Sequence, residues 1–195
     1  MLRSLAVLYL MISTPALASE PEVDYDSTII NADYSIASPV GELRSSTAGN
    51  STQGLGFEVR IHPSETLKIG FATSWQVFRE HKNAPGTQSG AQYERHTASL
   101  VPVLATANYV WHHGAMRTFV GMGGGMMMSR RTIAALAEDT VDTTWYIAAS
   151  GLAGAVYELT PGFGLEGKMR YVGGYKDGYK PLGMVQMTLG FVFFF

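Results

Sequence analysis

The most regular feature of the chain is an alternation of apolar with polar or small residues. Between residues 54 and 62, Leu55, Phe57 and Val59 fall on one side of an extended segment, and Glu58 and Arg60 fall on the other. A period of two is that of a β-strand, whose successive side chains point to opposite faces. The same alternation returns in other segments, so we expect an all-β fold.

Eight such segments are predicted, and the connections between them are alternately long and short. The predicted strands cover residues 30–36, 54–62, 67–77, 96–111, 115–128, 145–159, 165–171 and 185–195. Short turns are predicted at Pro63–Glu65, His112–Gly114 and Thr160–Gly162, and long loops at Pro39–Gln53, Arg79–Gln92, Ser129–Asp142 and Gly173–Pro181. This rhythm is typical of transmembrane barrels, which have short periplasmic turns and longer extracellular loops.

Three details of this prediction concern single segments. Pro102 has no N–H for a ladder hydrogen bond, so we expect it at a sheet edge, a bulge or a strand end. Ile133–Ala137, inside a predicted long loop, are expected to form one or two helical turns. The first strand is the weakest in pattern, and the last strand should pair with it around Ile30–Ile36.

Alternation alone does not say which face of a barrel points inward, because soluble barrels also alternate. Charged residues make up 15% of the chain, below the ~25% of soluble domains, and the polar face carries mainly small residues. Aromatic residues gather near predicted strand ends, as in the interfacial girdles of membrane barrels: Tyr109, Trp111, Tyr157 and Phe195 at the short turns, and Trp75, Trp145 and Tyr171 toward the long loops. We therefore predict an eight-stranded antiparallel up-and-down transmembrane β-barrel, with Val185, Met187, Leu189, Phe191, Phe193 and Phe195 on the lipid face of its last strand.

The predicted cross-strand neighbours of the inward charges are mostly small, as a narrow eight-stranded interior requires. Counting outward from the turns places Glu58 beside Ala72, Arg60 beside Gly70, Lys168 beside Gly154, and Glu166 beside Val156.

The N-terminus has the pattern of a secretory signal peptide. Arg3 precedes the apolar run Leu5–Ile12, and Pro15–Ala18 supplies an A-x-A cleavage site. We expect residues 1–18 to be removed and residues 19–195 to form the barrel domain, in the outer membrane of a Gram-negative bacterium.

At this point the chain resembles the outer membrane protein A-like family of small β-barrels. The resemblance is carried by Arg117–Gly125, by Gly164–Tyr171 and by the last strand. In that strand Thr188, Gly190, Phe193 and Phe195 are similar to the family's assembly signal. The resemblance implies that the barrel assembly machinery and periplasmic chaperones are partners during biogenesis.

One group of charged residues is predicted to face the lumen, where opposite signs should pair. An ion path through the barrel and a salt-bridged plug are both possible readings, and we favour the plug because an eight-stranded interior is only as wide as its side chains. The predicted group is Glu58, Arg60, Lys68, Glu158, Glu166, Lys168 and Arg170.

A second group of basic residues lies in or beside the long loops and could contact the phosphates of lipopolysaccharide, although ordinary solvated charge is an equal alternative. These residues are Arg79, Lys82, Arg95, Arg130 and Arg131, with Lys176 and Lys180 nearby.

Other chemistry finds little support in the sequence. The histidines at positions 62, 81, 96, 112 and 113 lack the spacing of a metal site, and the chain has no Cys. His96 and Ser99 fall on opposite faces of their strand, which disfavours a hydrolase dyad. A net charge of −2 argues against nucleic acid. We expect no enzyme activity, no metal and no cofactor.

The function expected from these observations is structural or surface-interactive: envelope integrity, adhesion, or contact with a surface partner through the loops. We expect a monomer surrounded by outer-membrane lipids and lipopolysaccharide. A narrow passive channel for ions or small solutes is the first alternative, and a lipid A-modifying enzyme is the second.

Overall fold

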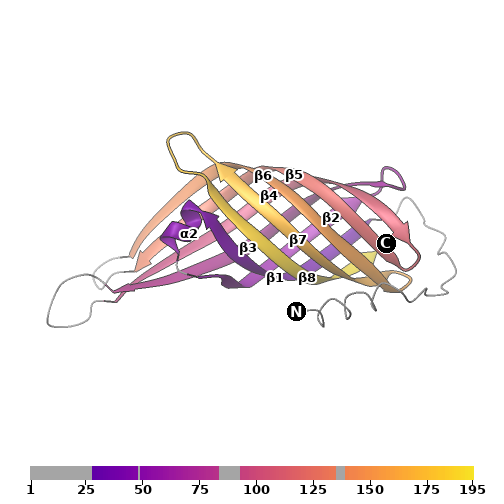
Figure 1. The fold of residues 1–195 in the computed structure, drawn as a ribbon, viewed down its shortest axis with the longest axis horizontal. Coiled ribbons are helices and arrows are strands. Elements are labelled where there is room, and N and C mark those ends of the chain that lie inside the picture. Colours follow the sequence, from indigo (N-terminus) through magenta and orange to yellow (C-terminus); the bar gives the residue numbers. More distant parts are fainter. Residues whose placement is uncertain (1–27, 48, 84–92, 135–138) are drawn as a thin grey trace, which may run out of the picture.

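The computed structural model describes residues 28–47, 49–83, 93–134 and 139–195, so the predicted signal peptide lies outside the described residues. Within these ranges the chain forms eight β-strands and one short helix (Figure 1). No helix among them is long and apolar enough to cross a membrane. The elements are β1 (Ile29–Gly41), α2 (Glu42–Ser46), β2 (Ser51–Ile61), β3 (Leu67–Asn83), β4 (Tyr93–His113), β5 (Met116–Ala134), β6 (Asp139–Thr160), β7 (Phe163–Tyr175) and β8 (Leu182–Phe194).

The strands form one closed antiparallel barrel in which each strand pairs with its sequence neighbours and β8 pairs with β1. The predicted closure is confirmed, because Ile30 lies opposite Phe193 and Ile36 opposite Met187. The predicted registers on either side of two short turns are also confirmed, with Arg60 opposite Gly70 and Lys168 opposite Gly154. Closure leaves no strand with an open edge among the described elements.

The barrel has two ends that differ in their connections (Figure 1). At one end, which we call the C-terminal end, Thr28 and Phe195 exchange two backbone hydrogen bonds of 2.9 Å, and the short turns lie there. Gly114 and Gly162 supply the positive φ that two of these turns require. At the other end, which we call the α2 end, the strands continue further than their alternation predicted.

The predicted long loops are therefore shorter than expected, and this part of the prediction was wrong. The segment Pro39–Gln53 contains the end of β1, helix α2 and the start of β2. Strand β3 continues to Asn83, and β7 continues to Tyr175. Polar residues beyond the apolar stripe remain in the ladder because their backbone groups pair with the neighbouring strand.

The predicted helical turn at Ile133–Ala137 is wrong for its first two residues. Ile133 and Ala134 belong to β5 and lie opposite Thr140 and Asp139 of β6, whereas residues 135–138 lie outside the described residues. The helix that does form, α2, was not predicted. Five residues leave too little periodicity to detect, and burial of Leu43 anchors it instead.

Pro102 also differs from its prediction, because it lies in the middle of β4 and not at an edge, bulge or strand end. The pairing of β4 with β5 is regular at this point, and Pro102 lies opposite Met127. On the side facing β3 the Pro102 carbonyl accepts a 3.0 Å hydrogen bond from the Thr73 hydroxyl. Between the pairs Thr73–Val103 and Gln76–Leu100 the two strands are not paired, so the missing N–H of Pro102 falls in a gap of the ladder.

The outer surface carries the apolar faces of the strands, as predicted. Leu55 and Phe57 of β2, Phe71 of β3, and Leu189 and Phe191 of β8 are all exposed. Both predicted groups of aromatic residues also point outward, and Tyr109 and Trp111 contact each other edge to face at 4.9 Å. An apolar belt on this scale has no counterpart on a water-soluble surface.

The lumen is layered, and apolar clusters that were not predicted lie on both sides of the predicted charges. Along β8 the inward residues run from Leu182 and Met184 through Gln186 to Gly190 and Val192. An outer apolar cluster fills the α2 end, and an inner apolar cluster fills the C-terminal end. The outer cluster comprises Ala37, Leu43, Phe78, Ala98, Leu100, Leu104, Met127, Tyr146, Ala148, Val172, Leu182 and Met184; the inner one comprises Ile29, Val110, Phe119, Leu152, Val156 and Val192, with Phe194 packed against it.

Candidate functional site

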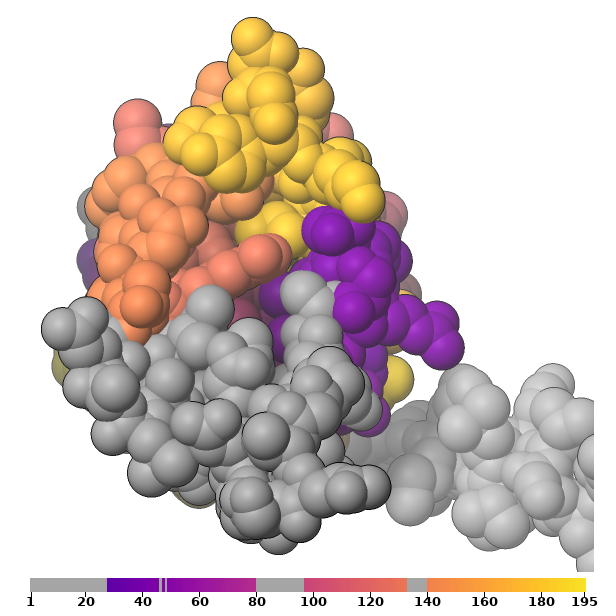
Figure 2. Space-filling model, turned by 90° about the vertical axis from the view of Figure 1, so that its left-hand side faces the viewer, coloured from indigo at the N-terminus to yellow at the C-terminus, as the bar shows by residue number. Residues whose placement is uncertain are grey.

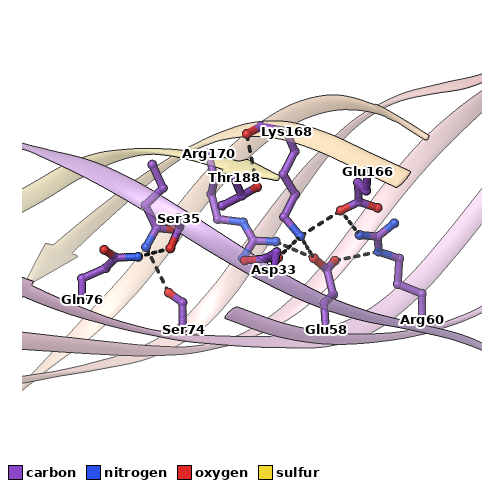
Figure 3. Close-up of polar contacts among 11 residues, drawn as sticks. Asp33, Ser35, Glu58, Arg60, Ser74, Gln76, Glu166, Lys168, Arg170 and Thr188 are labelled. Carbon is purple, nitrogen blue, oxygen red and sulfur yellow. Dashed lines mark hydrogen bonds and ion pairs between the residues drawn. The ribbon is translucent and has the colours of Figure 1, made fainter. Parts of the chain in front are cut away.

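The charged layer between the two apolar clusters is centred on Glu58 of β2 (Figure 3). Its carboxylate accepts from Arg60 Nε at 2.9 Å, from Lys168 Nζ at 2.9 Å and from Arg170 Nη2 at 2.8 Å. Arg60 lies on the same strand, whereas Lys168 and Arg170 reach across from β7. Glu58 therefore ties β2 to β7 through the middle of the lumen.

Two further carboxylates complete this network. Glu166 of β7 accepts from Arg60 Nη2 at 2.7 Å and from Lys168 Nζ at 2.9 Å. Asp33 of β1 lies 2.9 Å from Lys168 Nζ. All six members are more than nine-tenths buried, and three acids face three bases, so the layer carries no net charge.

Small residues make room for this network, and two glycines show why. A Cβ at Gly70 would lie 2.2 Å from the Val59 carbonyl oxygen and 3.1 Å from Arg60 Cα. A Cβ at Gly190 would lie 2.5 Å from both Ala32 O and Asp33 Cβ. Neither position can accept a side chain without movement of the backbone.

A second ion pair lies at the C-terminal end of the lumen. Arg117 Nη2 of β5 contacts Glu158 Oε2 of β6 at 2.6 Å, and its guanidinium lies 4.9 Å from the centre of the Phe194 ring. Lys68 of β3 is also buried in this part of the lumen. It takes part in no ion pair among the described residues, unlike the other predicted lumen charges.

Neutral polar residues extend the layer toward the α2 end (Figure 3). The Gln76 amide of β3 donates to the Ser35 hydroxyl of β1, and the Gln186 amide of β8 donates to the Ser74 hydroxyl at 3.0 Å. These bonds cross the lumen between strands that are not neighbours. Like the ion pairs between β2 and β7, they join strands that are two or three places apart around the barrel.

Helix α2 packs against the lumen at the α2 end. Leu43 is fully buried in the outer apolar cluster. Glu42 is held by Lys180 of the β7–β8 connection at 3.2 Å, and Figure 2 shows the purple α2 segment beside the yellow β7–β8 segment. A pocket of about 290 Å³ lies next to this contact, lined in part by Tyr146, Tyr179 and Arg131.

The basic residues predicted beside the long loops are only partly described. Arg79 is exposed and donates to Gln53 Oε1 at 2.8 Å. Arg130 is exposed, and Arg131 is half-buried opposite Asp142. The side chains of Lys82 and Arg95 lie outside the described residues. Arg79 and Arg130 are separated along the barrel wall by β4, which pairs with both β3 and β5.

The residues of the predicted assembly signal occupy both faces of β8. Thr188 and Gly190 face the lumen, where the Thr188 hydroxyl donates to the Lys168 carbonyl at 3.3 Å. Phe193 and Phe195 face outward and are exposed, and the Phe193 ring lies 5.4 Å from that of Phe163. Thr188 and Gly190 therefore also take part in the packing around the charged layer.

The histidines form no metal site in the described part of the chain. No group of three His, Cys, Asp or Glu residues there has the geometry of a metal site. The side chains of His81 and His96 lie outside the described residues, so the proposed separation of His96 from Ser99 is not tested.

Solved structures with a similar backbone are small bacterial outer-membrane barrels. The outer membrane protein OprG of Pseudomonas aeruginosa aligns with a TM-score of 0.51 and 12% identity, over 91% of this chain and 99% of that one. The chain has the fold of the small outer-membrane β-barrels. The resemblance to the outer membrane protein A-like family is thereby confirmed in its architecture.

Two other small barrels align over similar lengths. Neisserial surface protein A gives 16% identity and a TM-score of 0.49, over 86% of this chain and 95% of that one. Ail, the attachment invasion locus protein of Yersinia pestis, gives 12% identity and a TM-score of 0.48, over 86% of this chain and 97% of that one. No family model and no curated protein matches the sequence.

Sequence reasoning missed two charged members of this small barrel's lumen, Asp33 and Arg117. Both were visible in principle. Asp33 alternates with Tyr34 in the first strand, and Arg117 opens the segment that carried the family resemblance. The inward direction of Asp33 was not predicted because the first strand has a weak alternation. That of Arg117 was not predicted because it lies next to a turn.

Proposed function

We propose that this chain is an integral β-barrel of the Gram-negative outer membrane, with a closed lumen and a structural or surface-interaction role. The apolar outer surface supports the membrane placement, because a belt of exposed Leu, Phe, Trp and Met side chains is stable only against lipid. The layered lumen supports the absence of a pore.

The observation that carries this proposal is the packing of the barrel interior. Any path for ions would have to cross the outer apolar cluster, the charged layer and the inner apolar cluster in turn. In the charged layer every acid is already paired with a base, so opening a path would require separating buried charges, which costs several kcal/mol each. Leu43 of α2 adds a further barrier at the α2 end.

Planar-bilayer recordings test the closed lumen against the narrow-channel alternative. We expect the purified full chain to insert without unitary current steps at any voltage in KCl. As a control for insertion, the chain recovered from the same membranes should still show a gel mobility that changes on heating. Reproducible current steps from the unaltered chain would contradict the proposal.

The surface-interaction role rests on the α2 end, where the strands continue beyond the aromatic residues and carry polar and charged side chains. Replacing residues 84–92 by a short Gly-Ser link should abolish binding to a surface partner. Gel mobility should still change on heating, as expected of a folded barrel. Binding that survives this replacement would contradict a role for that connection.

Contact with lipopolysaccharide is proposed for the basic residues at the same end, since Arg side chains bind phosphate groups in bidentate fashion. Arg79→Gln with Arg130→Gln should weaken binding of purified lipopolysaccharide. Lys68→Gln, which alters a buried residue, serves as the control. If all three proteins bind lipopolysaccharide equally, Arg79 and Arg130 do not contact it and are ordinary solvated charges.

We also propose a non-enzymatic role, cleavage after Ala18 and assembly by the barrel machinery. Mass spectrometry of lipid A from cells with and without the protein should show identical profiles, and a changed profile would favour the enzyme alternative. The mature protein isolated from membranes should begin at Ser19, and retention of residues 1–18 would contradict the signal peptide.

A further inference from the structure

Among the charged lumen residues that the structure describes, Lys68 is the one without an ion pair. It is the second residue of β3, only 2% exposed, and its side chain points into the barrel. No hydrogen bond or ion pair of its ammonium group is found among the described residues. An ammonium group held in the lumen without a protein partner is unfavourable, so its charge must be hydrated, neutralised or compensated.

The charge balance of the lumen leaves one positive charge in excess, and it falls at Lys68. In the described part of the barrel, each of the four lumen acids contacts at least one base, and every base except Lys68 contacts an acid. The acids are Asp33, Glu58, Glu158 and Glu166, and the bases are Arg60, Lys68, Arg117, Lys168 and Arg170.

The neighbouring cations increase the need for a negative charge beside Lys68. Arg60 and Arg117 both act on Lys68 electrostatically, and they oppose the attraction from Glu166 and Glu158. Those two acids already contact Arg60 and Arg117 directly, at 2.7 and 2.6 Å. Their charge is therefore largely committed to other partners.

Asn108 of β4 is a second unsatisfied group at the same place. It lies directly opposite Lys68 in the ladder and is 1% exposed. Neither Asn108 Nδ2 nor Asn108 Oδ1 has a hydrogen-bond partner. On its other side is Gly121, where a Cβ would lie only 2.0 Å from Asn108 Oδ1, so the absence of a side chain there leaves room for the amide.

We propose that Lys68 and Asn108 bind a small monovalent anion of the halide class inside the lumen. The ammonium group supplies the opposite charge, and the amide N–H groups of Asn108 supply directed donors. One monovalent anion balances the one excess positive charge, whereas a phosphate or sulfate would overcompensate it. The inner apolar cluster, including Val110 and Phe119, closes the site toward the C-terminal end.

The test compares the full chain in detergent in sodium chloride and in sodium gluconate at equal ionic strength. At a chloride concentration about ten times Kd, we expect the temperature of unfolding, followed by gel mobility, to be higher by about 3–6 °C in chloride. Lys68→Met keeps the length of the side chain but removes its charge, and should unfold at the same temperature in both salts. Lys176→Met, on the β7–β8 connection, is the matched control and should keep the chloride effect.

Two results overturn the proposal: an unaltered chain that unfolds at the same temperature in both salts, or a Lys68→Met variant that keeps the difference. If Lys68→Met does not fold, crystals of the unaltered chain grown in sodium bromide decide the question by anomalous scattering. A bromide peak between Lys68 and Asn108 supports the site. A lumen without such a peak indicates a neutral or hydrated amine and overturns it.

Discussion

Glu58 joins more cations than any other residue of the lumen, with three bases within 2.9 Å. In a low-dielectric interior, removing one partner leaves the others as uncompensated buried charges, and that penalty exceeds the net contribution of the pairs themselves. The stability of the barrel should therefore depend strongly on this one carboxylate.

Glu58→Gln should lower the free energy of unfolding by about 3–5 kcal/mol, measured by urea titration of the folded barrel in lipid vesicles. The matched control is Glu65→Gln in the exposed β2–β3 turn, which should change stability by less than about 0.5 kcal/mol. Equal stability of the two variants would show that the network does not hold the barrel together.

Gly190 of β8 and Gly167 of β7 differ in how closely other atoms surround them, so alanine at these two positions tests the packing of the lumen. A Cβ at Gly190 would collide with Ala32 O and Asp33, whereas a Cβ at Gly167 would meet nothing within 4 Å. We expect Gly190→Ala to reduce the folded, heat-modifiable fraction severely and Gly167→Ala to leave it unchanged or raised. Tolerance of alanine at Gly190 would contradict the close packing described for the charged layer.

At the scale of elements, the sequence predicted strand number, register and outward faces well, because a period of two directly reports which side chains share a face. It failed where other forces decide the structure. The ends of β3, β5 and β7 are set by backbone pairing, and α2 by burial of Leu43. In β4 both faces are apolar, so Leu100 and Leu104 gave no sign that they point inward.

The candidate site could be predicted only in part for a related reason. Alternation places Glu58, Arg60, Lys168 and Arg170 in the lumen, but it does not give the contacts between β2 and β7. Those contacts depend on the curvature of the closed barrel, which brings together strands that are not neighbours in the sheet. For the same reason, the isolation of Lys68 could not be read from the sequence.

The terminal strand carries the next prediction. Phe195 is 71% exposed at the end of the apolar belt, and its backbone is held by Thr28. Phe195→Asp should lower the amount of protein in the outer membrane several-fold, measured by immunoblot of membrane fractions. Thr160→Asp, an exposed position at the end of β6, is the control and should assemble normally. Normal yield of Phe195→Asp would contradict a role for this residue in assembly.

At the scale of the whole molecule, the exposed aromatic residues define where the membrane should begin and end. Trp111 lies near the C-terminal end of the barrel, and Trp75 and Trp145 lie toward the α2 end, all with exposed side chains. Indole rings prefer the interface between headgroups and hydrocarbon. The belt between these rings should therefore match the thickness of the hydrocarbon core.

Single-tryptophan variants test this placement, with the other two tryptophans replaced by Phe. In vesicles of brominated phospholipid, each remaining Trp should be quenched more strongly by bromine near the headgroup than by bromine near the end of the acyl chain. Quenching that is strongest at the bilayer centre for Trp75, Trp111 or Trp145 would place the belt at the wrong depth.

The pairing of β1 with β8 also constrains when folding can take place. Thirteen residue pairs join these strands, among them Ile29 with Phe194 and Gly41 with Leu182. The ribosome makes β1 first and β8 last, so a growing chain cannot close its sheet before synthesis has passed Phe194. Until then both edge strands are open to unwanted partners. The barrel can therefore close only after synthesis has passed Phe194, and until then the chain must be kept from pairing elsewhere.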